Sequence, residues 1–446
     1  MSRLFGTDGV RGVANKELTP LLAMQLGQAG ASVLTKETSH KPTIMVGCDT
    51  RISGDMLANA LMAGVCSVGA NAVYVGIVPT PAVAYLTRKN HMDAGVVISA
   101  SHNPVEFNGI KFFDANGYKL PDAMEDEIEA IIKNDMKDLA FPTGTEIGSI
   151  TYRTDAREDY VKHATEAIPV DLHGMKIVAD CAEGASYYTS VEALKLLGAD
   201  VVAIHNNPDG TNINAGCGST HMEELMERVK AEKADVGLAF DGDADRMLAV
   251  DENGKVIDGD LILYICGKYL MEQGRLEGNT IVTTVMSNLG LYKACDKIGM
   301  KYEQTAVGDK YVYENMLKNG YILGGEQSGH IIFSKHATTG DGMLTAIMLM
   351  EVILEKKQSL HALCEGMKMY PQYLENVRVS DKKAVTENPA VQKKKQEIEE
   401  ELAGNGRIIL RESGTEPVIR VMAEADSDEL CRKYVGEMVE VIKTIL

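Results

Sequence analysis

A pattern of alternating strands and helices recurs three times along the chain, and it constrains the fold more than any other feature. Each copy has an apolar strand, a helix that ends in an apolar residue followed by glycine, a second strand, and a third strand that runs into a polar loop. The first strands are at 43–48, 176–180 and 280–285, and the third strands are at 94–99, 234–240 and 321–324. Alternating apolar strands and helices predict an α/β fold with three related α/β domains and mainly parallel mixed sheets.

The last part of the chain follows a different pattern. After Met369 the sequence predicts a strand at 374–379, a charged helix at 390–402, strands at 407–410 and 418–422, and a terminal helix. Ser427 is suited to cap that helix, and an apolar stripe follows it at helical spacing. The stripe consists of Leu430, Tyr434, Met438, Val441, Ile442 and Ile445. The sequence therefore predicts a smaller C-terminal α+β domain.

These patterns divide the 446 residues into four domains. A length prior of about 150 residues per domain gives roughly three domains and allows four. The polar segment 134–157 favours the first boundary, and the predicted domains are 1–150, 151–253, 254–367 and 368–446. In open α/β sheets, ligands bind beyond the carboxyl ends of the strands. We therefore expect the domains to lie around a central cleft, with equivalent loops facing it.

Three aspartates, Asp241, Asp243 and Asp245, follow the third strand of the second repeat. Like charges this close repel one another, so they require a cation, and all-oxygen ligands favour Mg²⁺ or Ca²⁺ over zinc. These aspartates and Glu252 also match ligand positions of a calcium-binding EF-hand loop. Arg246, however, stands where that loop needs glycine, and strands flank the segment instead of helices. The sequence therefore favours magnesium, with Arg246 suited to bind phosphate oxygens beside the ion.

Ser101 follows the third strand of the first repeat, and Pro104 fixes the turn after it. A serine hydroxyl that projects from a rigid loop tip is suited to act as a nucleophile. The Gly-x-Ser-x-Gly turn of serine hydrolases is absent around it. Together with the aspartates, this favours phosphoserine chemistry, in which phosphorylated Ser101 gives an oxygen to the ion. Arg11, in a glycine-rich opening segment, and Lys111 are candidates for a role in the transfer.

Two further loops are suited to a sugar phosphate. Glu326, Ser328 and His330 offer an acceptor, a hydroxyl and a titratable imidazole for sugar hydroxyls, although His330 is as compatible with a structural role. The segment 411–417, followed by Arg420, has the makeup of an anion cradle, with a plain turn as the alternative. The candidate phosphate ligands are Arg411, Ser413, Gly414, Thr415 and Arg420.

The composition restricts the partners and the compartment. With 45 Lys and Arg against 64 Asp and Glu, the net charge of -19 repels nucleic acid and anionic membranes, so an anionic partner must be small. The eight cysteines form no Cys-x-x-Cys pair, which indicates buried, reduced thiols in a cytoplasmic protein. The N-terminus lacks the apolar core of a signal peptide, and Glu351 interrupts the apolar stretch 346–354, so no membrane segment is expected.

Five motifs in order, from residue 5 to residue 420, resemble those of the α-D-phosphohexomutases. They are Phe-Gly-Thr-Asp-Gly-Val-Arg-Gly, Ser-Ala-Ser-His-Asn-Pro, Asp-Gly-Asp-Ala-Asp-Arg, Gly-Glu-Gln-Ser-Gly-His and Arg-Glu-Ser-Gly-Thr-Glu-Pro. The opening octapeptide, Ala244 and Gln327 are similar to the phosphoglucosamine mutase branch, whereas the mannomutase and glucomutase branch usually has Gly and Met at the last two places. The resemblance implies an isomerase that interconverts glucosamine 6-phosphate and glucosamine 1-phosphate.

The resemblance also implies the parts of the mechanism. Mg²⁺ would be bound by the three aspartates and the phosphate on Ser101, and glucosamine 1,6-bisphosphate would form as the intermediate. The four domains would carry, in order, the phosphoserine, the metal ligands, the sugar-recognition loop and the phosphate cradle. The sequence does not decide which residue transfers protons; the candidates are His102, Lys111, Arg11 and His330. The resemblance further suggests a homodimer, charging of Ser101 by a bisphosphate or a Ser/Thr kinase, and a role in supplying UDP-N-acetylglucosamine for cell-wall (peptidoglycan) precursors.

Three other functions stay open on the sequence. A mutase for glucose or mannose phosphates would be distinguished from a mutase for glucosamine phosphates by comparing kcat/KM on glucosamine 6-phosphate and glucose 6-phosphate. A phosphatase that passes through a phosphoserine would release inorganic phosphate in place of an isomer. A non-catalytic Ca²⁺-binding protein would bind calcium tightly and magnesium weakly.

Overall fold

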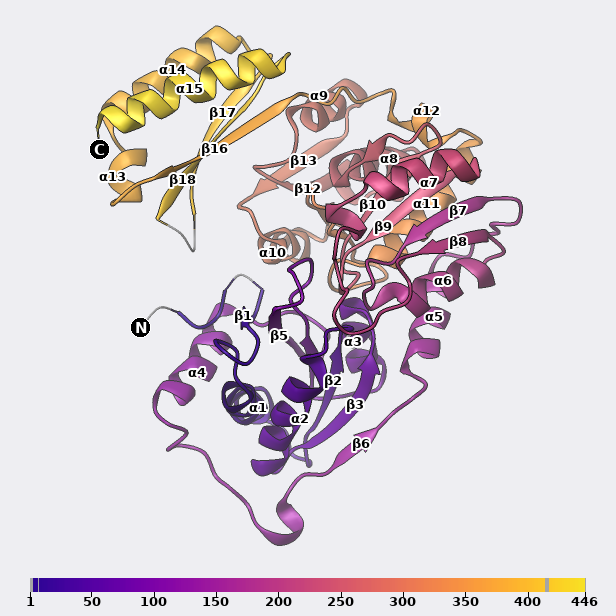
Figure 1. The fold of residues 1–446 in the computed structure, drawn as a ribbon, viewed down its shortest axis with the longest axis vertical. Coiled ribbons are helices and arrows are strands. Elements are labelled where there is room, and N and C mark those ends of the chain that lie inside the picture. The colour runs from indigo at the N-terminus through magenta and orange to yellow at the C-terminus, as the bar shows by residue number, and fades with distance from the viewer. Residues whose placement is uncertain (1–2, 7, 414–416, 446) are drawn as a thin grey trace. The chain divides into compact units, whose positions relative to one another are not determined.

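The structure, a computed structural model, describes residues 3–6, 8–413 and 417–445. The chain forms two compact units, Met1–Met286 with Met300–Cys364 and Ser287–Gly299 with Glu365–Leu446. Figure 1 traces the chain through both units. Of the sheets among the described residues, three belong to the first unit and one to the second.

The first sheet of unit one has six strands in the order β1-β5-β4-β2-β3-β6. The strands are β1 (Val10–Val13), β2 (Thr43–Cys48), β3 (Asn71–Ile77), β4 (Ala94–Ile98), β5 (Phe107–Asp114) and β6 (Ile150–Tyr152). The helices are α1 (Pro20–Thr35), α2 (Gly54–Ser67), α3 (Thr80–Lys89) and α4 (Asp122–Lys133), with a 3-10 turn at Gly144–Glu146. β4, β2, β3 and β6 run parallel, β5 pairs antiparallel with β4, and β1 pairs antiparallel with β5. β2 and β4 are buried almost throughout, as is typical of central parallel strands.

The second sheet has the strand order β11-β10-β9-β7-β8. The strands are β7 (Lys176–Asp180), β8 (Asp200–Ile204), β9 (Val236–Phe240), β10 (Met247–Asp251) and β11 (Val256–Ile257). The helices are α5 (Ala156–Ala167), α6 (Ser186–Leu196) and α7 (Glu223–Glu232), with a 3-10 turn, η2, at Gly218–Thr220. β8, β7 and β9 run parallel, whereas β10 and β11 run antiparallel to their neighbours.

The third sheet has the strand order β13-β12-β14-β15. The strands are β12 (Thr280–Thr284), β13 (Lys301–Thr305), β14 (Leu323–Gly325) and β15 (Ile331–Phe333). The helices of this part of unit one are α8 (Gly259–Glu272), α10 (Asp309–Asn319), α11 (Gly342–Lys356) and α12 (Leu360–Cys364), with a 3-10 turn at Glu277–Asn279. β12 is parallel to β13 and β14, and β15 is antiparallel to β14.

The second unit contains an antiparallel sheet in the order β16-β18-β17. The strands are β16 (Gln372–Arg378), β17 (Arg407–Glu412) and β18 (Val418–Glu424). The helices are α9 (Leu289–Ile298), α13 (Lys382–Thr386), α14 (Pro389–Leu402) and α15 (Asp428–Thr444). The Ser427 side chain caps α15 by accepting the N–H of Leu430 at 3.3 Å, as predicted. Leu430, which we placed in the apolar stripe, lies in the first turn of the helix and is 36% exposed.

The predicted fold class is confirmed: three mixed α/β sheets are followed by a smaller antiparallel α+β part. In each of the first three sheets, the third strand of the repeat turns back into an antiparallel neighbour. Among the described residues, no helix has both the length and the apolar character needed to cross a membrane. The predicted domain limits at 150, 253 and 367 stay predictions.

Several predicted bounds differ from the structure for local reasons. The strand predicted at 234–240 begins at Val236, because the Ala234 N–H donates to the Val229 carbonyl and finishes helix α7. The strand predicted at 321–324 begins at Leu323, because the Tyr321 N–H bonds back to Met316 in α10. The segment 134–157, predicted as a boundary, also supplies β6, which pairs with β3 at the edge of the first sheet.

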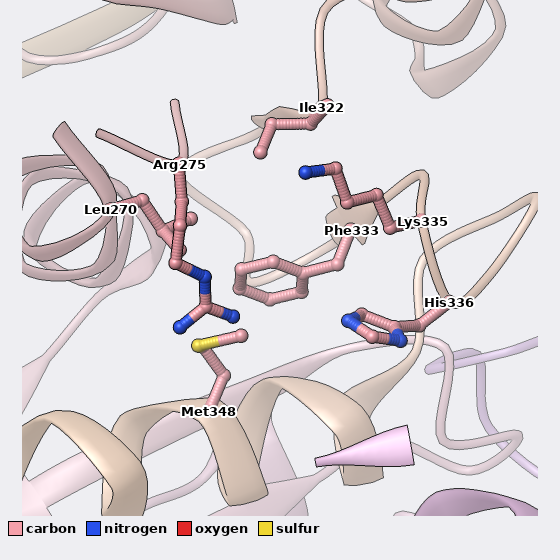
Figure 2. Close-up of a pocket in the computed structure, with 7 residues that line it drawn as sticks. All are labelled: Leu270, Arg275, Ile322, Phe333, Lys335, His336 and Met348. Carbon is pink, nitrogen blue, oxygen red and sulfur yellow. The ribbon is translucent and has the colours of Figure 1, made fainter. Parts of the chain in front are cut away.

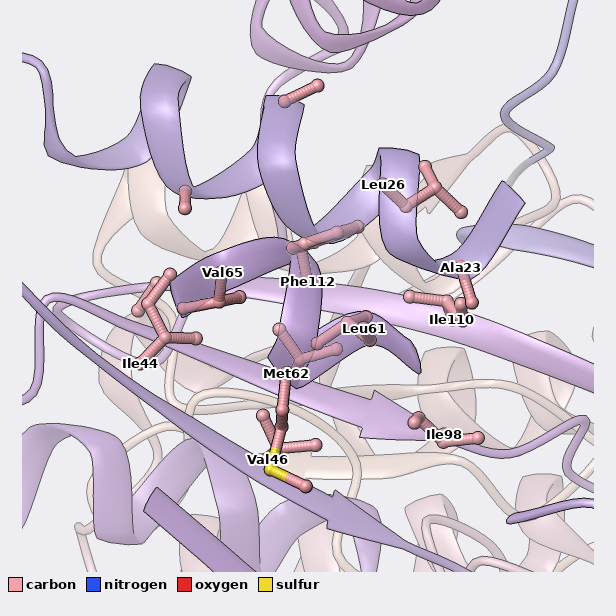
Figure 3. Close-up of a cluster of buried hydrophobic side chains, with 14 of the residues drawn as sticks. Ala23, Leu26, Ile44, Val46, Leu61, Met62, Val65, Ile98, Ile110 and Phe112 are labelled. Carbon is pink, nitrogen blue, oxygen red and sulfur yellow. The ribbon is translucent and has the colours of Figure 1, made fainter. Parts of the chain in front are cut away.

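The core of the first sheet lies against helices α1 and α2 (Figure 3). Leu61 and Met62 of α2 are fully buried, as are Ile44, Val46 and Ile98 of the strands. Burying a large apolar side chain contributes about 1.5–3 kcal/mol, so this layer fixes the orientation of the strands whose ends carry the polar loops.

Two glycines let α1 and α2 pack closely. A Cβ atom at Gly27 would overlap the carbonyl oxygen of Leu61, and one at Gly64 would overlap the carbonyl oxygen of Met24. Since each obstacle is backbone, it cannot move aside as a flexible side chain can. The two helices therefore require glycine at both positions.

We predict that Gly64→Ala destabilises the first unit by about 1–3 kcal/mol, because the added methyl forces α1 and α2 apart. Denaturant unfolding, with amide exchange of α1 as a local readout, measures the effect. Gly54→Ala in the same helix is the control, since its Cβ would come no closer than 3.6 Å to Cys48. Equal losses in the two variants would contradict the close-packing explanation.

Candidate active site

Ser101 lies in the loop between β4 and β5 and faces the aspartate loop. Its Oγ donates to Asp241 Oδ2 at 2.6 Å, and its N–H donates to Ser99 Oγ at 3.0 Å. Its φ of 53° is in the left-handed region, which is strained for a non-glycine residue. We expected a hydroxyl projecting from a loop tip, but Ser101 is only 1% exposed because the aspartate loop covers it.

Arg51 holds the backbone of the Ser101 loop. Its side chain is fully buried and pairs with Asp49, at 2.9 Å between Nε and Oδ2. The guanidinium also donates to the carbonyls of Ser101 at 2.9 Å and of Asn103 at 2.7 Å. The Asn214 amide donates to the same two carbonyls at 2.9 and 3.1 Å. These bonds stabilise the strained conformation of Ser101.

The three aspartates leave β9 together and are all buried. They offer oxygen atoms that lie within 4.8 Å of one another. Asp243 Oδ2 accepts bonds from Thr80 Oγ1 at 2.5 Å and Lys111 Nζ at 2.8 Å. Asp243 Oδ1 and Asp245 Oδ1 are buried without a hydrogen-bond partner among the described residues. Oxygen atoms in this state are suited to be ligands of a cation.

The electrostatics of the three aspartates also favour a bound cation. Burial, together with the charges of Asp245 and Asp243, holds the pKa of Asp241 well above its usual range. Burial alone would also raise the pKa of Asp245, but Lys111 and His330 outweigh it and hold that pKa well below the usual range. A divalent cation would remove the mutual repulsion that raises the pKa of Asp241. The all-oxygen donor set therefore fits Mg²⁺.

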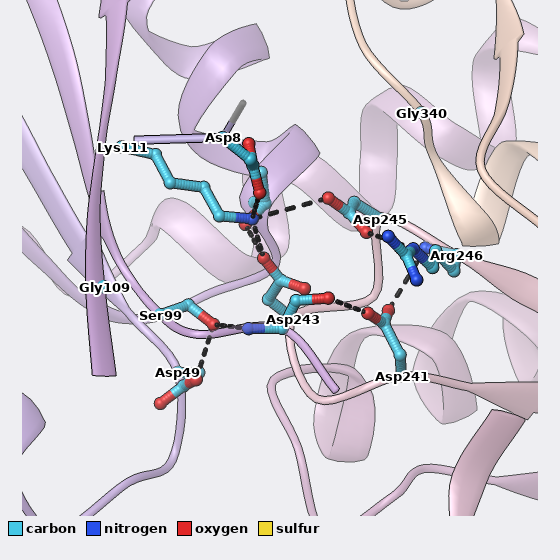
Figure 4. A network of polar contacts seen from close by, with 12 residues as sticks. Asp8, Asp49, Ser99, Gly109, Lys111, Asp241, Asp243, Asp245, Arg246 and Gly340 are labelled. Atoms are coloured by element: carbon cyan, nitrogen blue, oxygen red, sulfur yellow. Dashed lines mark hydrogen bonds and ion pairs between the residues drawn. The ribbon is translucent and has the colours of Figure 1, made fainter. Parts of the chain in front are cut away.

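A chain of ion pairs runs through this part of unit one (Figure 4). Lys111 Nζ lies 2.9 Å from Asp8, 2.8 Å from Asp243 and 3.5 Å from Asp245. Lys119 Nζ also contacts Asp8, at 2.6 Å, and pairs with Asp309. Burial would lower the pKa of Lys111, but its three carboxylates raise it far above the usual value. Lys111 therefore stays a cation whose charge joins the first repeat to the second, and Lys119 extends the ion pairs to Asp309 in the third.

His102 connects Ser101 to Arg246. Its Nδ1 lies 3.3 Å from Ser101 Oγ and 3.3 Å from an Arg246 nitrogen. Burial and the charges of Arg246 and Arg11 lower the pKa of His102 to about 4. Arg11 contacts Asp8 at 2.5 Å and donates to the Asn103 side chain at 3.4 Å. The predicted residues Arg11, His102 and Arg246 thus lie around the serine.

His330 is buried between two carboxylates. Its Nδ1 lies 3.6 Å from Asp245 and its Nε2 lies 3.3 Å from Asp309, while the Gly340 N–H donates to Nε2 at 3.0 Å. Burial lowers the pKa of His330, but the two carboxylates outweigh it and raise that pKa. His330 therefore links the aspartate loop to the third repeat, and its part in proton transfer stays a prediction.

The predicted sugar loop is anchored next to Arg246. The Gly329 carbonyl accepts the N–H of Met247 at 3.1 Å, and Gly329 has a φ of 90°. Glu326 Oε1 accepts the N–H of Gly308 at 3.1 Å. Ser328 Oγ is buried without a hydrogen-bond partner among the described residues, so it can serve a ligand.

The predicted phosphate cradle belongs to the second unit. The register of β17 and β18 pairs Arg411 directly with Arg420. Two guanidinium groups at opposite positions of neighbouring strands can both donate hydrogen bonds to one phosphate. Ser413 is buried, its N–H donates to Val418 at 3.0 Å, and its carbonyl accepts from Lys382 Nζ at 2.5 Å. Gly414 and Thr415 lie outside the described residues.

A separate small pocket lies in the third part of unit one (Figure 2). Basic and apolar side chains line it together, and a guanidinium nitrogen of Arg275 lies 3.0 Å from Glu351 Oε1. The lining residues are Leu270, Arg275, Ile322, Phe333, Lys335, His336 and Met348. None of them is a predicted site residue, so the buried aspartate and serine cluster is the candidate site.

Four family descriptions of phosphoglucomutase/phosphomannomutase match the chain in order. The alpha/beta/alpha domains I, II and III match residues 2–138, 158–254 and 258–370, and the C-terminal domain matches residues 374–441.

Proteins that are similar over nearly the whole chain have a more specific name than the family descriptions. Phosphoglucosamine mutases from Ruminiclostridium cellulolyticum and Clostridium acetobutylicum are each 56% identical over 445 residues, covering 99% of this chain and 99% of each relative. The chain belongs to the phosphoglucomutase/phosphomannomutase family, in the branch of the phosphoglucosamine mutases. The resemblance of the five motifs to this family is thereby confirmed.

Solved structures of this family share the fold at low identity. A phosphoglucomutase/phosphomannomutase family protein from Burkholderia thailandensis has a TM-score of 0.83 at 23% identity, covering 100% of this chain and 98% of that one. N-acetylphosphoglucosamine mutase from Aspergillus fumigatus, in complex with GlcNAc-6P and magnesium, has a TM-score of 0.70 at 17% identity. The match covers 99% of this chain and 95% of that one.

Sequence reasoning missed the residues that support the loops. Asp49 and Arg51 follow the carboxyl end of β2, so the strand-end rule that found the other loops could have found them. Asn214 gave no such signal, because it stands in a long polar loop whose path depends on tertiary contacts.

We predict that Arg51→Met destabilises the first unit by about 3–5 kcal/mol, because it leaves the Asp49 carboxylate buried without its partner. Denaturant unfolding measures the loss. The double variant Asp49→Asn with Arg51→Met should recover part of it, since no lone buried charge remains. The control Arg3→Met removes an arginine that is 43% exposed, and it should cost about 1 kcal/mol or less. A small loss in Arg51→Met would mean that the buried pair is not structural.

Proposed function

We propose that the chain is a phosphoglucosamine mutase, an isomerase that interconverts glucosamine 6-phosphate and glucosamine 1-phosphate through phosphorylated Ser101. The observation that carries this proposal is the 2.6 Å bond from Ser101 Oγ to Asp241 within the buried aspartate cluster. It brings a hydroxyl nucleophile to a site built for a cation, which phosphoryl transfer requires. The names of the relatives at 56% identity support the choice of substrate.

Asp241, Asp243, Asp245 and the phosphate on Ser101 would hold Mg²⁺. The two carboxylate oxygens without a hydrogen-bond partner, Asp243 Oδ1 and Asp245 Oδ1, support this assignment. When bound, the ion would polarise the phosphoryl group and offset the charge on its oxygens. Lys111 and Arg246 would add fixed positive charge beside it, at no cost of reorganisation during the reaction.

Two half-reactions give the isomer. In the first, phosphorus bonds to the free hydroxyl oxygen of the sugar phosphate and a base takes the hydroxyl proton, while the bond from Ser101 Oγ to phosphorus breaks and Oγ takes up a proton from an acid. The product of this half-reaction is glucosamine 1,6-bisphosphate, which turns end for end. In the second, the phosphoryl group at the other carbon is transferred to Ser101 Oγ, which gives its proton to a base, and the sugar oxygen takes up a proton. The acid and base belong to the set His102, Lys111, Arg11 and His330.

The remaining predicted residues would hold the substrate. Glu326 and Ser328 would bind ring hydroxyls in both orientations of the sugar. The phosphate that does not react would bind to the cradle, where Arg411 and Arg420 lie opposite each other on β17 and β18 and can both donate to one phosphate. Ser413, Gly414 and Thr415 complete the proposed cradle.

The metabolic setting follows from this reaction. Its product would supply UDP-N-acetylglucosamine for peptidoglycan precursors, so we propose a cytoplasmic location and a small sugar phosphate as the partner. We also propose a homodimer. Ser101 would receive its first phosphate from the 1,6-bisphosphate or from a Ser/Thr kinase.

We predict that Ser101→Ala lowers mutase kcat by roughly three orders of magnitude or more, because the phosphoryl acceptor is lost. The assay includes glucosamine 1,6-bisphosphate, and intact mass spectrometry follows one added phosphate that should disappear in the variant. Ser149→Ala, at an exposed serine, is the control. Turnover near that of the wild type in Ser101→Ala would overturn the phosphoserine mechanism. Stoichiometric release of inorganic phosphate would indicate a phosphatase instead.

We predict that Arg420→Ala raises KM about 10-fold or more and changes kcat less, because the cradle binds a phosphate that does not react. Steady-state kinetics on glucosamine 1-phosphate separate the two constants. Arg432→Ala, at an exposed arginine of α15, is the charge-matched control and should leave both constants unchanged. An unchanged KM in Arg420→Ala would remove Arg420 from the cradle.

A further inference from the structure

A second group of metal-binding side chains lies at the carboxyl ends of β7 and β8, and the proposed mechanism does not use it. Asp180 is the last residue of β7 and pairs with Ile204, the last residue of β8, so His205 follows directly beside it. Cys217 caps the 3-10 turn η2. Asp180, His205 and Cys217 offer a carboxylate oxygen, a ring nitrogen and a sulfur that lie within 4.8 Å of one another.

Neighbouring groups hold the side chains of Asp180 and His205 in place. The fully buried Asp180 is fixed by two backbone donors, the N–H of Ala182 to Oδ1 and the N–H of Gly218 to Oδ2, both at 2.9 Å. His205 Nδ1 lies 3.1 Å from Asp180 Oδ2, but it is a buried nitrogen without hydrogen-bond geometry to any partner among the described residues.

The other nitrogen of the same imidazole carries a supporting carboxylate. His205 Nε2 lies 3.2 Å from Glu224 Oε2. Histidines that bind metal with one ring nitrogen usually donate the other N–H to a carboxylate, which fixes the tautomer and raises the basicity of the ligand. Glu224 therefore fixes the ring so that Nδ1 lies beside Asp180 Oδ2 within the group of three donors, and this contact is independent of the clustering itself.

The charges around the sulfur also favour a cation. Cys217 is buried, and the carboxylates of Asp180, Glu183 and Glu224 are negative groups that act on its sulfur. Glu183 Oε2 is a further buried oxygen without a hydrogen-bond partner among the described residues. A divalent ion would reverse the sign of this local field, and a thiol that binds it loses its proton.

We propose that Asp180, His205 and Cys217 bind a divalent transition-metal ion of the zinc class, with Glu183 or water in the fourth position. A nitrogen, sulfur and oxygen donor set selects borderline or soft ions such as Zn²⁺ and Co²⁺, whereas Mg²⁺ selects the all-oxygen aspartate triad. His205 is 21% exposed and offers a route for the ion from solvent. Binding breaks the S–H bond of Cys217, forms a metal–sulfur bond and releases one proton to solvent.

The site would stabilise a segment that reaches the serine loop. Two backbone bonds tie this segment to the turn after β7, from Glu183 N–H to His205 at 2.7 Å and from Asn214 N–H to Ala182 at 2.9 Å. The same Asn214 donates its side-chain amide to the Ser101 carbonyl at 2.9 Å. An ion held by His205 and Cys217 fixes the segment on both sides of Asn214. It is therefore a structural ion, and it touches neither substrate nor Ser101.

Cobalt binding to the full-length protein tests this site independently of mutase activity. The apoprotein is titrated with Co²⁺ alone, and the near-ultraviolet thiolate-to-cobalt charge-transfer absorption is recorded, because the all-oxygen triad cannot produce it. We expect one thiolate-bound Co²⁺ per chain, weaker binding at lower pH, and displacement of the cobalt by Zn²⁺. Cys217→Ser should abolish the band, and Cys66→Ser, at a buried cysteine of α2, should keep it.

His205→Gln provides a second variant in case Cys217→Ser does not fold. It keeps the thiol but removes the nitrogen ligand, so we expect the affinity for Co²⁺ to fall at least 10-fold while far-ultraviolet circular dichroism stays unchanged. The absence of the charge-transfer band in folded wild-type protein would overturn the proposal. A band that persists in Cys217→Ser, or an affinity unchanged in His205→Gln, would also overturn it.

Discussion

Three buried carboxylates within five residues are the constraint on which the first unit depends. Removing a charge from water costs several kcal/mol even after relaxation, and Asp241, Asp243 and Asp245 also repel one another. Lys111 compensates in part, because it contacts Asp243 and Asp245, and a divalent ion bound to the triad would offset more of the negative charge. Lys111 belongs to the first repeat and also contacts Asp8, whereas Asp243 and Asp245 belong to the second. The demand for positive charge therefore holds loops from different repeats together.

The serine loop shows how this constraint is combined with a strained backbone. Ser101 has a left-handed φ, and its own carbonyl and that of Asn103 are held by Arg51 and Asn214. A conformation of this kind costs of order 1–3 kcal/mol and persists only when its surroundings overdetermine it. This conformation orients the Ser101 hydroxyl toward Asp241 before any ligand binds.

The sequence predicted the parts of this arrangement that follow from strand periodicity. β2 and β7 agree with the predicted strands residue for residue, since buried parallel strands are continuous apolar runs with sharp ends. The same rule placed polar loops at strand ends. It could have pointed to Arg51, which follows the end of β2, but not to the contacts that Arg51 makes, because its partners are mainly backbone carbonyls and therefore carry no residue identity. Nor could it reveal Asn214 or the Glu224 contact with His205, which depend on how a long loop folds back.

Two strand ends of the second sheet therefore carry potential metal ligands with different donor atoms. Asp180 ends β7 and Asp241 follows β9, and these strands are parallel neighbours in one sheet. The loops after them are joined by the bond from the Ala185 N–H to the Gly242 carbonyl at 2.8 Å. The triad presents oxygens alone, whereas the neighbouring site adds sulfur and nitrogen, so each selects a different class of ion. An ion at the second site would act on the serine through position and not through charge, because its link to Ser101 is the Asn214 amide.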